Sequence, residues 1–351
     1  MKVALVYDRV NKWGGAERVI IALRKMFPDS VLYTSVYKKD KASWAKKIPI
    51  VPSFLQKIPF ASSYHEALAF LMPLAFESFS FDEFDLVISV TSESAKGIIT
   101  KPGTRHICIC LTPTRYLWSG YKEYFKDKFL KFISTPVVAY LRVWDKIAAQ
   151  RPDKLIAISE NVARRIKKYY GLNSEIIYPP LMIKNFKYKA HDGKYFLVVS
   201  RLVPYKRIDL AIKAANTLKL KLKIVGVGSE LDRLQEMAGP TVEFVGSVSD
   251  DELKQYYAGA TALIFPGVED FGLTMVEANA AGKPVIAFRG GGASEIIVEG
   301  KSGEFFDRQN TTSLVSVLKK FRQTRYNTID CRQNAKRFSY EQFSRMILKV
   351  L

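Results

Sequence analysis

Residues 262–288 have the sequence ALIFPGVEDFGLTMVEANAAGKPVIAF, which predicts a strand, a loop, a helix and the next strand. The apolar run ends at Phe265, and Gly282 and Pro284 mark the end of the helix and the start of the second strand. The loop carries Glu269, an acidic residue close behind a buried strand. A strand, a helix and a further strand in this order are typical of a parallel sheet with helices on its faces.

The same alternation of apolar runs and helical patterns extends over most of the 351 residues. Nearly continuous apolar runs indicate parallel strands that helices cover on both faces. Strands are expected at 2–7, 31–35, 86–90, 105–110, 154–159, 195–200, 221–225, 242–245, 262–265 and 284–288. Helices are expected at 16–26, 160–169, 208–217, 229–238 and 274–281. The sequence therefore predicts an α/β protein with two doubly wound sheets.

The segment YPPLMIKNFKYKAHDG at 178–193 interrupts this alternation. Its two prolines, its basic run and its Asp-Gly pair are typical of a linker. We expect a first domain at 1–178, a linker at 179–193, a second domain at 194–335 and a terminal helical segment at 336–351. Ligands of doubly wound sheets bind beyond the carboxyl ends of the strands, so the expected site faces a cleft between the domains.

The charge of the chain favours an anionic partner, because 54 Lys and Arg against 34 Asp and Glu give a formal net charge of +20. Phosphorylated small molecules, anionic lipid and nucleic acid all fit, and a general effect on solubility is the alternative. No nucleic-acid module is evident, so no specific nucleic-acid partner is expected. The first residues look like a strand and not a signal peptide, and the three cysteines lack metal spacing. A cytoplasmic protein is therefore expected.

Two glutamates of the opening segment are candidates for binding a sugar. Glu269 lies in the predicted loop and Glu277 in the first turns of the predicted helix. An ionised carboxylate suits paired hydroxyl groups, because each hydrogen bond to it contributes about 1.5–3 kcal/mol. The alternative is that Glu277 only complements the helix dipole and Glu269 is solvated.

Two cations follow another predicted strand, in the sequence VVSRLVPYKRIDLAI at 198–212. Arg201 and Lys206 precede a helix, where charge, free backbone amides and the helix dipole act together on a diphosphate. Two exposed surface cations are the alternative. Gly14 and Gly15 open the first helix and permit close approach of a phosphate to backbone amides, with a plain turn as the alternative.

The sequence EDFGLTMVE at 269–277 resembles the signature of retaining glycosyltransferases of family 4, two glutamates separated by seven residues. The resemblance implies the GT-B fold, with two Rossmann-like domains, and transfer of a hexose from a nucleotide diphosphate sugar with retention of configuration. It implies that Glu269 contacts the donor sugar, Glu277 the ribose, and Arg201 with Lys206 the diphosphate. Arg201, Lys206 and Glu269 are thus the expected catalytic residues. The implied donor-binding residues are Gly14, Gly15, Arg201, Lys206, Val245, Glu269, Phe271, Gly272, Leu273, Thr274 and Glu277.

The first half resembles the mannosyltransferase-like branch that builds polysaccharide and O-antigen units, in part through LTPTRYLW at 111–118. This segment supplies the acceptor-side candidates Arg115, Tyr116 and Trp118. The branch implies a GDP-linked sugar in preference to a UDP-linked one, and a glycan or polyprenyl-linked acceptor. Many relatives have a histidine where this chain has Leu111, and His106 is expected at the opposite end of the strand. A weakly active or non-catalytic relative in a glycan assembly complex therefore stays an alternative, as does a GT-B epimerase or phosphorylase.

No Asp-x-Asp pair occurs, so no metal and no other cofactor is expected. Fixed cations and glycine loops would neutralise the leaving diphosphate instead.

Residues 120–151 are basic and aromatic, and such a partly amphipathic stretch suits an anionic membrane surface, with 55–81 as an adjoining apolar region. The alternative is that the aromatic side chains are core and the lysines a solvated face. We expect a protein that is cytoplasmic or peripheral on the cytoplasmic face of the membrane.

Overall fold

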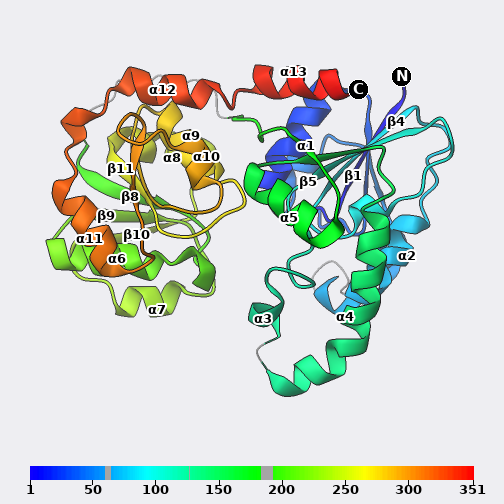
Figure 1. The fold of residues 1–351 in the computed structure, drawn as a ribbon, viewed down its shortest axis with the longest axis horizontal. Helices are drawn as coiled ribbons and strands as arrows, with labels where there is room; N and C mark the ends of the chain where they lie inside the picture. Colours follow the sequence, from blue (N-terminus) through cyan, green and yellow to red (C-terminus); the bar gives the residue numbers. More distant parts are fainter. Residues whose placement is uncertain (60–64, 126, 183–192) are drawn as a thin grey trace. The chain divides into compact units, whose positions relative to one another are not determined.

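The computed structural model describes residues 1–59, 65–125, 127–182 and 193–351 (Figure 1). Its contacts divide the chain into two compact units. The first comprises Met1–Pro180 and Phe343–Leu351, and the second comprises Leu181–Gln342. Most of the predicted linker, at 183–192, lies outside the described residues.

The first unit is built on a seven-stranded sheet in the order β3-β2-β1-β4-β5-β6-β7, and each pair of neighbours is parallel. The strands are β1 Val3–Tyr7, β2 Val31–Thr34, β3 Ile50–Pro52, β4 Leu86–Thr91, β5 Arg105–Cys110, β6 Lys154–Ala157 and β7 Glu175–Ile176. The α-helices are α1 Gly15–Met26, α2 Met72–Glu77, α3 Tyr121–Tyr124, α4 Lys128–Ala148, α5 Glu160–Tyr170 and α13 Tyr340–Val350. Short 3₁₀ helices are η1 Ser43–Ala45, η2 Phe54–Lys57, η3 His65–Leu71 and η4 Ala95–Gly97.

The second unit has a six-stranded parallel sheet in the order β10-β9-β8-β11-β12-β13. The strands are β8 Tyr195–Val199, β9 Leu222–Val225, β10 Val242–Gly246, β11 Ala260–Phe265, β12 Val285–Phe288 and β13 Gly303–Phe306. The helices are η5 Pro204–Lys206, α6 Ile208–Leu218, α7 Leu231–Glu236, α8 Asp250–Gly259, α9 Leu273–Ala280, α10 Ala293–Ile296, α11 Thr311–Lys320, η6 Gln323–Arg325 and α12 Thr328–Lys336.

Local sequence signals account for these elements. All five residues of β1 are buried, as expected for a central strand covered on both faces. Helix α5 begins at Ser159, whose hydroxyl accepts from the Val162 amide, and ends at Gly171, whose positive φ of 76° suits glycine. The core of the second unit joins β8, β9, β11 and β12 with α6 and α11.

The predicted fold class is confirmed, and each of the ten predicted strands coincides with an observed one within two residues at either end. Three short strands, β3, β7 and β13, were not predicted, and all three lie at sheet edges. β3 and β7 are partly exposed, so their residues lack the continuous apolar run that marks a central strand.

The end of the chain is held by the first unit. Phe343, Ile347 and Val350 are the buried residues of α13, at helical spacing. The Arg105 guanidinium donates to the Val350 carbonyl at 2.8 Å and also bonds the Leu351 carbonyl. The contacts of α13 therefore fasten its last turn to the start of β5.

His106 gives the first unit a sensitivity to acid. It is buried in β5 with Nε2 2.8 Å from the Ser89 hydroxyl, and burial lowers its pKa to about 3. The unfolded chain binds a proton at this ring near pH 6.5. Since the folded pKa is depressed, the stability is fully present above about pH 6.5 and is lost as the pH falls towards 3, by about 1.4 kcal/mol per pH unit.

We predict that His106→Asn lacks this part of the pH dependence. Urea unfolding between about pH 7 and pH 4 can be followed by tryptophan fluorescence. All four tryptophans (Trp13, Trp44, Trp118 and Trp144) lie in the first unit and report on it. Equal slopes of unfolding free energy against pH in the wild type and the variant would contradict the assignment.

Candidate functional site

Two loops of the second unit meet at the carboxyl edge of its sheet. β8 and β11 are parallel neighbours, so the segments that follow them emerge side by side. Lys206 ends η5, in the first of these loops, and Glu269 lies in the second. The Lys206 ammonium contacts the Glu269 carboxylate in an ion pair.

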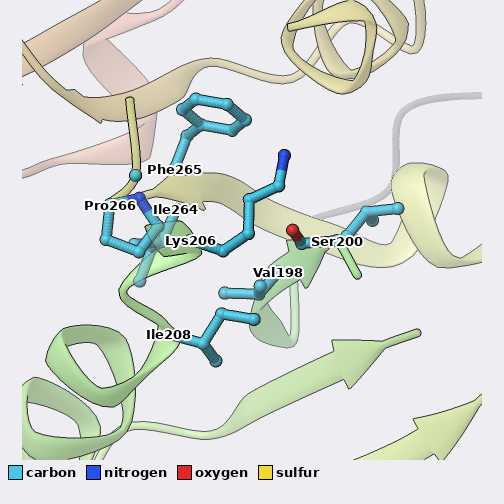
Figure 2. Close-up of a pocket in the computed structure, with 9 residues that line it drawn as sticks. Val198, Ser200, Lys206, Ile208, Ile264, Phe265 and Pro266 are labelled. Carbon is cyan, nitrogen blue, oxygen red and sulfur yellow. The ribbon is translucent and has the colours of Figure 1, made fainter. Parts of the chain in front are cut away.

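Lys206 is buried although it carries a charge, and the partly exposed Glu269 provides the opposite charge. Figure 2 shows the Lys206 side chain beside a small pocket lined by strand-end residues, among them Val198, Ser200 and Phe265. A cation in such apolar surroundings needs an anionic partner, because an unpaired buried charge is costly. The site is therefore suited to an anionic group.

Backbone contacts hold the two loops together. A Cβ at Gly267 would lie 2.9 Å from the Cα and the carbonyl oxygen of Lys206, so the chains touch there without a side chain between them. The Gly292 amide, which follows β12, donates to the Glu269 carbonyl at 2.9 Å. The position of Glu269 is thus set by loops from three strands.

Glu277 lies in α9 and is buried, with 3% of its surface exposed. Its carboxylate accepts a hydrogen bond from the Tyr257 hydroxyl of α8 at 2.8 Å. The alternative in which Glu277 only complements the helix dipole does not account for this burial and this hydrogen bond, and Glu269, the residue expected to be solvated in that alternative, is paired with Lys206. Glu277 is therefore held inside the unit by a hydrogen bond from a tyrosine of another helix.

The remaining predicted residues of this unit lie at the same sheet edge. Arg201 is exposed after β8, and its guanidinium donates to the Tyr205 hydroxyl at 2.8 Å. Val245 lies at the end of β10, two strands away from β8.

Four predicted residues form the start of α9 and its approach. Phe271 is buried against Phe338, with ring centroids 5.4 Å apart. Gly272 has a φ of 104°, a conformation that favours glycine, and precedes the partly exposed Leu273 and Thr274. This bend directs the chain from the Glu269 loop into α9.

In the first unit, Gly14 and Gly15 lie where α1 begins. Gly14 is the N-cap residue and has no side chain with which to cap the helix. A Cβ on Gly14 would lie 3.2 Å from the carboxylate of Glu17, which is buried and accepts from the Tyr7 hydroxyl at 2.6 Å. The role of these two glycines in binding a donor stays a prediction.

Asp8 joins the carboxyl ends of β1 and β4 at the same edge of the first sheet. Its buried carboxylate accepts from the Thr91 hydroxyl at 2.8 Å and from the amides of Ser92, Glu93, Ser94 and Ala95 at 2.6, 3.0, 2.9 and 2.9 Å. Burial raises the pKa of Asp8, and the hydrogen bonds from backbone amides oppose that rise. This carboxylate organises the turn that leads into η4.

The acceptor-side candidates follow β5 and lie beside a buried ion pair. Lys96 and Asp145 are each 1% exposed, and their charged atoms are 2.6 Å apart. Asp145 also accepts from Thr114 Oγ1 at 2.9 Å, Trp118 Nε1 at 2.7 Å and the Tyr170 hydroxyl at 2.7 Å. One carboxylate of α4 thus connects η4, α5 and the turn that carries Trp118.

Arg115, Tyr116 and Trp118 belong to that single turn. The Arg115 carbonyl accepts from the amides of Trp118 and Gly120 at 3.2 and 2.8 Å. The Trp118 ring stacks on Tyr169 with centroids 5.2 Å apart. The turn is rigidly held, and its role towards an acceptor stays a prediction.

Leu111 is partly buried directly after β5, and its amide donates to the Thr91 carbonyl at 2.7 Å. His106 lies five residues upstream in the strand, about 16 Å away by the rise of a strand. Its Nε2 is engaged by Ser89. His106 therefore does not take the place of the histidine that many relatives have at the position of Leu111.

Sequence reasoning missed the partners of the predicted residues. Tyr257 is 20 residues from Glu277, and nothing in the chain signals that contact. Asp8 follows a buried apolar strand, the same signal that marked Glu269. Lys96 lies in the sequence SESAKG at 92–97, far in the chain from its buried partner Asp145. Within the described ranges, no three His, Cys, Asp or Glu side chains group as metal ligands would.

Residues 183–338 match the family Glycosyl transferases group 1. This match spans the Lys206–Glu269 pair and Glu277, and it covers most of the second unit. The matched segment therefore coincides with the unit that contains all the predicted donor residues except Gly14 and Gly15.

Curated relatives match parts of the chain. It is 32% identical over 150 residues to the GDP-mannose-dependent alpha-(1-6)-phosphatidylinositol monomannoside mannosyltransferase of Mycolicibacterium smegmatis, covering 38% of this chain and 39% of the relative. It is 30% identical over 175 residues to the O-antigen chain mannosyltransferase RfbU of Salmonella typhimurium, covering 46% and 48%. The chain spans about half the length, or less, of these relatives.

Solved structures match over the whole chain. HepE of Anabaena, in complex with UDP, has a TM-score of 0.74 at 18% identity and covers 100% of this chain and 99% of its own. Sucrose-phosphate synthase from Thermosynechococcus elongatus has a TM-score of 0.75 at 15% identity and covers 100% and 98%. At these identities the likeness concerns the fold, and it confirms the expected GT-B architecture.

We predict that the Lys96–Asp145 pair is strongly coupled. Asp145→Asn in the wild type leaves the buried Lys96 ammonium without a counter-charge and should cost about 3–5 kcal/mol of unfolding free energy. In a Lys96→Met background the same change should cost at least about 1 kcal/mol less. Urea unfolding of the four proteins, followed by tryptophan fluorescence, measures the difference, and additive costs would refute the coupling.

Proposed function

We propose that this protein is a glycosyltransferase that moves a hexose from a nucleotide diphosphate sugar to a glycan or lipid-linked acceptor with retention of configuration. The observation that carries the proposal is the Lys206–Glu269 pair at the carboxyl edge of the second sheet. It lies inside the segment that matches Glycosyl transferases group 1. A cation and a carboxylate at this edge are suited to the diphosphate and to the sugar hydroxyls of such a donor.

The ion pair also suggests how a donor enters. Without ligand, Glu269 neutralises the buried Lys206. A diphosphate brings more negative charge than one carboxylate, so it would take over Lys206 and leave Glu269 to accept from sugar hydroxyls. Arg201, exposed in the same loop, would add a second cation to the diphosphate.

The proposed reaction is a displacement on one face of the sugar. The bond between the anomeric carbon and the diphosphate oxygen breaks, and the acceptor oxygen forms its bond on the same face of the sugar. The departing diphosphate takes the proton of the acceptor hydroxyl, so no covalent enzyme intermediate is involved. Arg201 and Lys206 stabilise the charge that develops on the leaving group, and Glu269 orients the sugar.

Two comparisons bear on the donor. The GDP-mannose-dependent enzyme of M. smegmatis and the O-antigen mannosyltransferase of S. typhimurium support a mannose-like sugar on GDP. The HepE complexes with UDP and UDP-glucose keep a UDP-linked sugar as the competing choice. Glu277, held by Tyr257, would bind the ribose hydroxyls that both nucleotides share.

Leu111 supports a second candidate, a nucleotide-sugar-binding relative with little or no turnover. Its side chain is apolar and partly buried where many family members have a histidine near the donor sugar. Such a protein would bind the nucleotide as proposed but would not transfer the sugar. Binding and turnover therefore need separate tests.

For binding, we predict that either GDP or UDP raises the thermal unfolding temperature of the second unit. At about a hundred times its dissociation constant, a nucleotide should stabilise the fold by roughly 2.7 kcal/mol. Glu277→Gln removes a charged acceptor and should weaken binding about tenfold or more. Lys206→Met should do the same by removing the cation, as titration calorimetry can measure.

Matched controls are available in the same unit. Glu236→Gln on α7 and Lys319→Met on α11 change exposed residues and should leave the affinity unchanged. An equal loss of nucleotide affinity in the controls would exclude this donor site. Full nucleotide affinity in Glu277→Gln and Lys206→Met would exclude it as well.

For turnover, we predict that the enzyme releases nucleoside diphosphate from GDP-mannose or UDP-glucose faster when an acceptor is present. Glu269→Gln should lower kcat at least about tenfold. Nuclear magnetic resonance of the product should show the anomeric configuration of the donor. An inverted product would overturn retention, while tight nucleotide binding without any turnover would favour the non-catalytic relative.

A further inference from the structure

Helix α4 has an apolar face that its own unit leaves uncovered. Phe129, Phe132, Ile133, Tyr140, Val143 and Ile147 are all more than half exposed, up to 79% at Phe132. We call these six residues the α4 stripe. Figure 1 shows α4 as a long helix that bends along its length, in keeping with Pro136 inside it.

The stripe follows the period of the helix. Pro136 lies inside the helix and divides the stripe: at about 100° per residue, Phe129, Phe132 and Ile133 before it fall within about 100°, and Tyr140, Val143 and Ile147 after it fall within about 60°. The buried residues of α4 lie on the opposite side, where Val138 and Leu141 pack with Leu117 and where Asp145 pairs with Lys96. The packed face and the apolar stripe are therefore two different faces. The interpretation of the aromatic side chains of 120–151 as core is wrong for Phe129 and Phe132, whereas Tyr121, Phe125 and Trp144 are partly buried.

Basic residues of α4 lie between the stripe and the packed face: at about 100° per residue, Lys146 lies about 40° beyond one edge of the stripe, Arg142 about 80° and Lys131 about 100°. Lys131 and Lys146 are exposed, and Arg142 is partly exposed between them in sequence. All three lie over aromatic rings of the neighbouring segment, Arg142 at 4.6 Å from Tyr121 and Lys146 at 5.6 Å from Trp118. The one acidic residue within α4, Asp145, is buried in its ion pair, so the exposed charge that α4 carries is positive.

We propose that α4 docks on an anionic lipid bilayer surface, with the stripe in the boundary of the acyl chains and the cations among the headgroups. A helix lies in a membrane interface in this way when it combines an apolar face with a basic flank. No helix in the described ranges is long and apolar enough to cross a bilayer. The association would therefore be peripheral.

Charge favours this occupant over a second copy of the chain. The chain has a net charge of +20, so two copies repel each other, whereas an anionic bilayer attracts the basic residues of α4. Helices α2 and α4 are neighbours, because Glu77 of α2 accepts a hydrogen bond from Trp144 Nε1 of α4 at 2.7 Å. The exposed Leu74 of α2 adds apolar surface next to α4. This docking goes beyond the proposed transfer reaction, because it concerns another face of the first unit.

Vesicle flotation with the full chain tests the proposal without any donor or acceptor. The probes are vesicles of phosphatidylcholine alone and of phosphatidylcholine mixed with phosphatidylglycerol. The wild type should float with the anionic vesicles and not with the neutral ones. Phe132→Ser with Val143→Ser should reduce partitioning about tenfold or more, and so should Lys131→Glu with Lys146→Glu.

Two control pairs match these changes elsewhere on the surface. Ile329→Ser with Leu348→Ser replaces exposed apolar residues of α12 and α13, and Lys319→Glu with Lys320→Glu makes the same change in net charge on α11. Both controls should bind vesicles within about twofold of the wild type. Circular dichroism confirms that each variant is folded.

Three outcomes would overturn the proposal. The first is absence of binding to either vesicle. The second is binding that the stripe variant and its control share equally, which would mean attraction by net charge alone. The third is a dimer in sedimentation that only the stripe variant dissociates, without vesicle binding, which would assign the stripe to a second copy. Because no sugar transfer is measured, these results are independent of the proposed function.

Discussion

The strands that pair in each sheet run parallel, and this constraint decides where the candidate residues lie. Parallel neighbours end at one edge, so loops that are far apart in sequence begin close together in space. Lys206 and Glu269 meet because β8 and β11 are neighbours in the sheet. The same rule brings the Asp8 carboxylate, after β1, to the amides that follow β4. Each unit thus gathers its polar chemistry at one edge and keeps its core apolar.

Burial at these edges makes partners necessary. A charge removed from water is tolerated only when an opposite charge or several hydrogen bonds replace its hydration. Lys96 has Asp145, Asp8 has four backbone amides and a hydroxyl, and Lys206 has Glu269. The first two arrangements lie inside the protein and serve its stability. The third includes a partly exposed carboxylate, so it is the pair that a ligand can reach and rearrange.

Helix α4 joins the interior and the surface of the first unit. Its inner face supplies Asp145, which holds Thr114, Trp118 and Tyr170 in place. Its outer face carries the apolar stripe, and Lys146 lies next to it. An exposed apolar face on such a helix is stabilised when it is removed from water, and a bilayer interface can do this while the other face stays packed in the protein. The turn with Arg115, Tyr116 and Trp118 is therefore built on the element that we propose to touch the bilayer.

The sequence by itself determined the two parallel sheets, the central strands, the loops that carry Glu269, Arg201 and Lys206, and the helix that carries Glu277. Continuous apolar runs mark buried strands, and the residues that follow them must lie at the edge of the sheet. Edge strands such as β7 escaped prediction because partial exposure relaxes the demand for apolar residues. Only the tertiary structure decided that Tyr257 holds Glu277, that Lys96 pairs with Asp145 and that Phe132 is exposed instead of core. These outcomes depend on contacts between segments distant in the chain, and local residue patterns do not encode which segment covers which face.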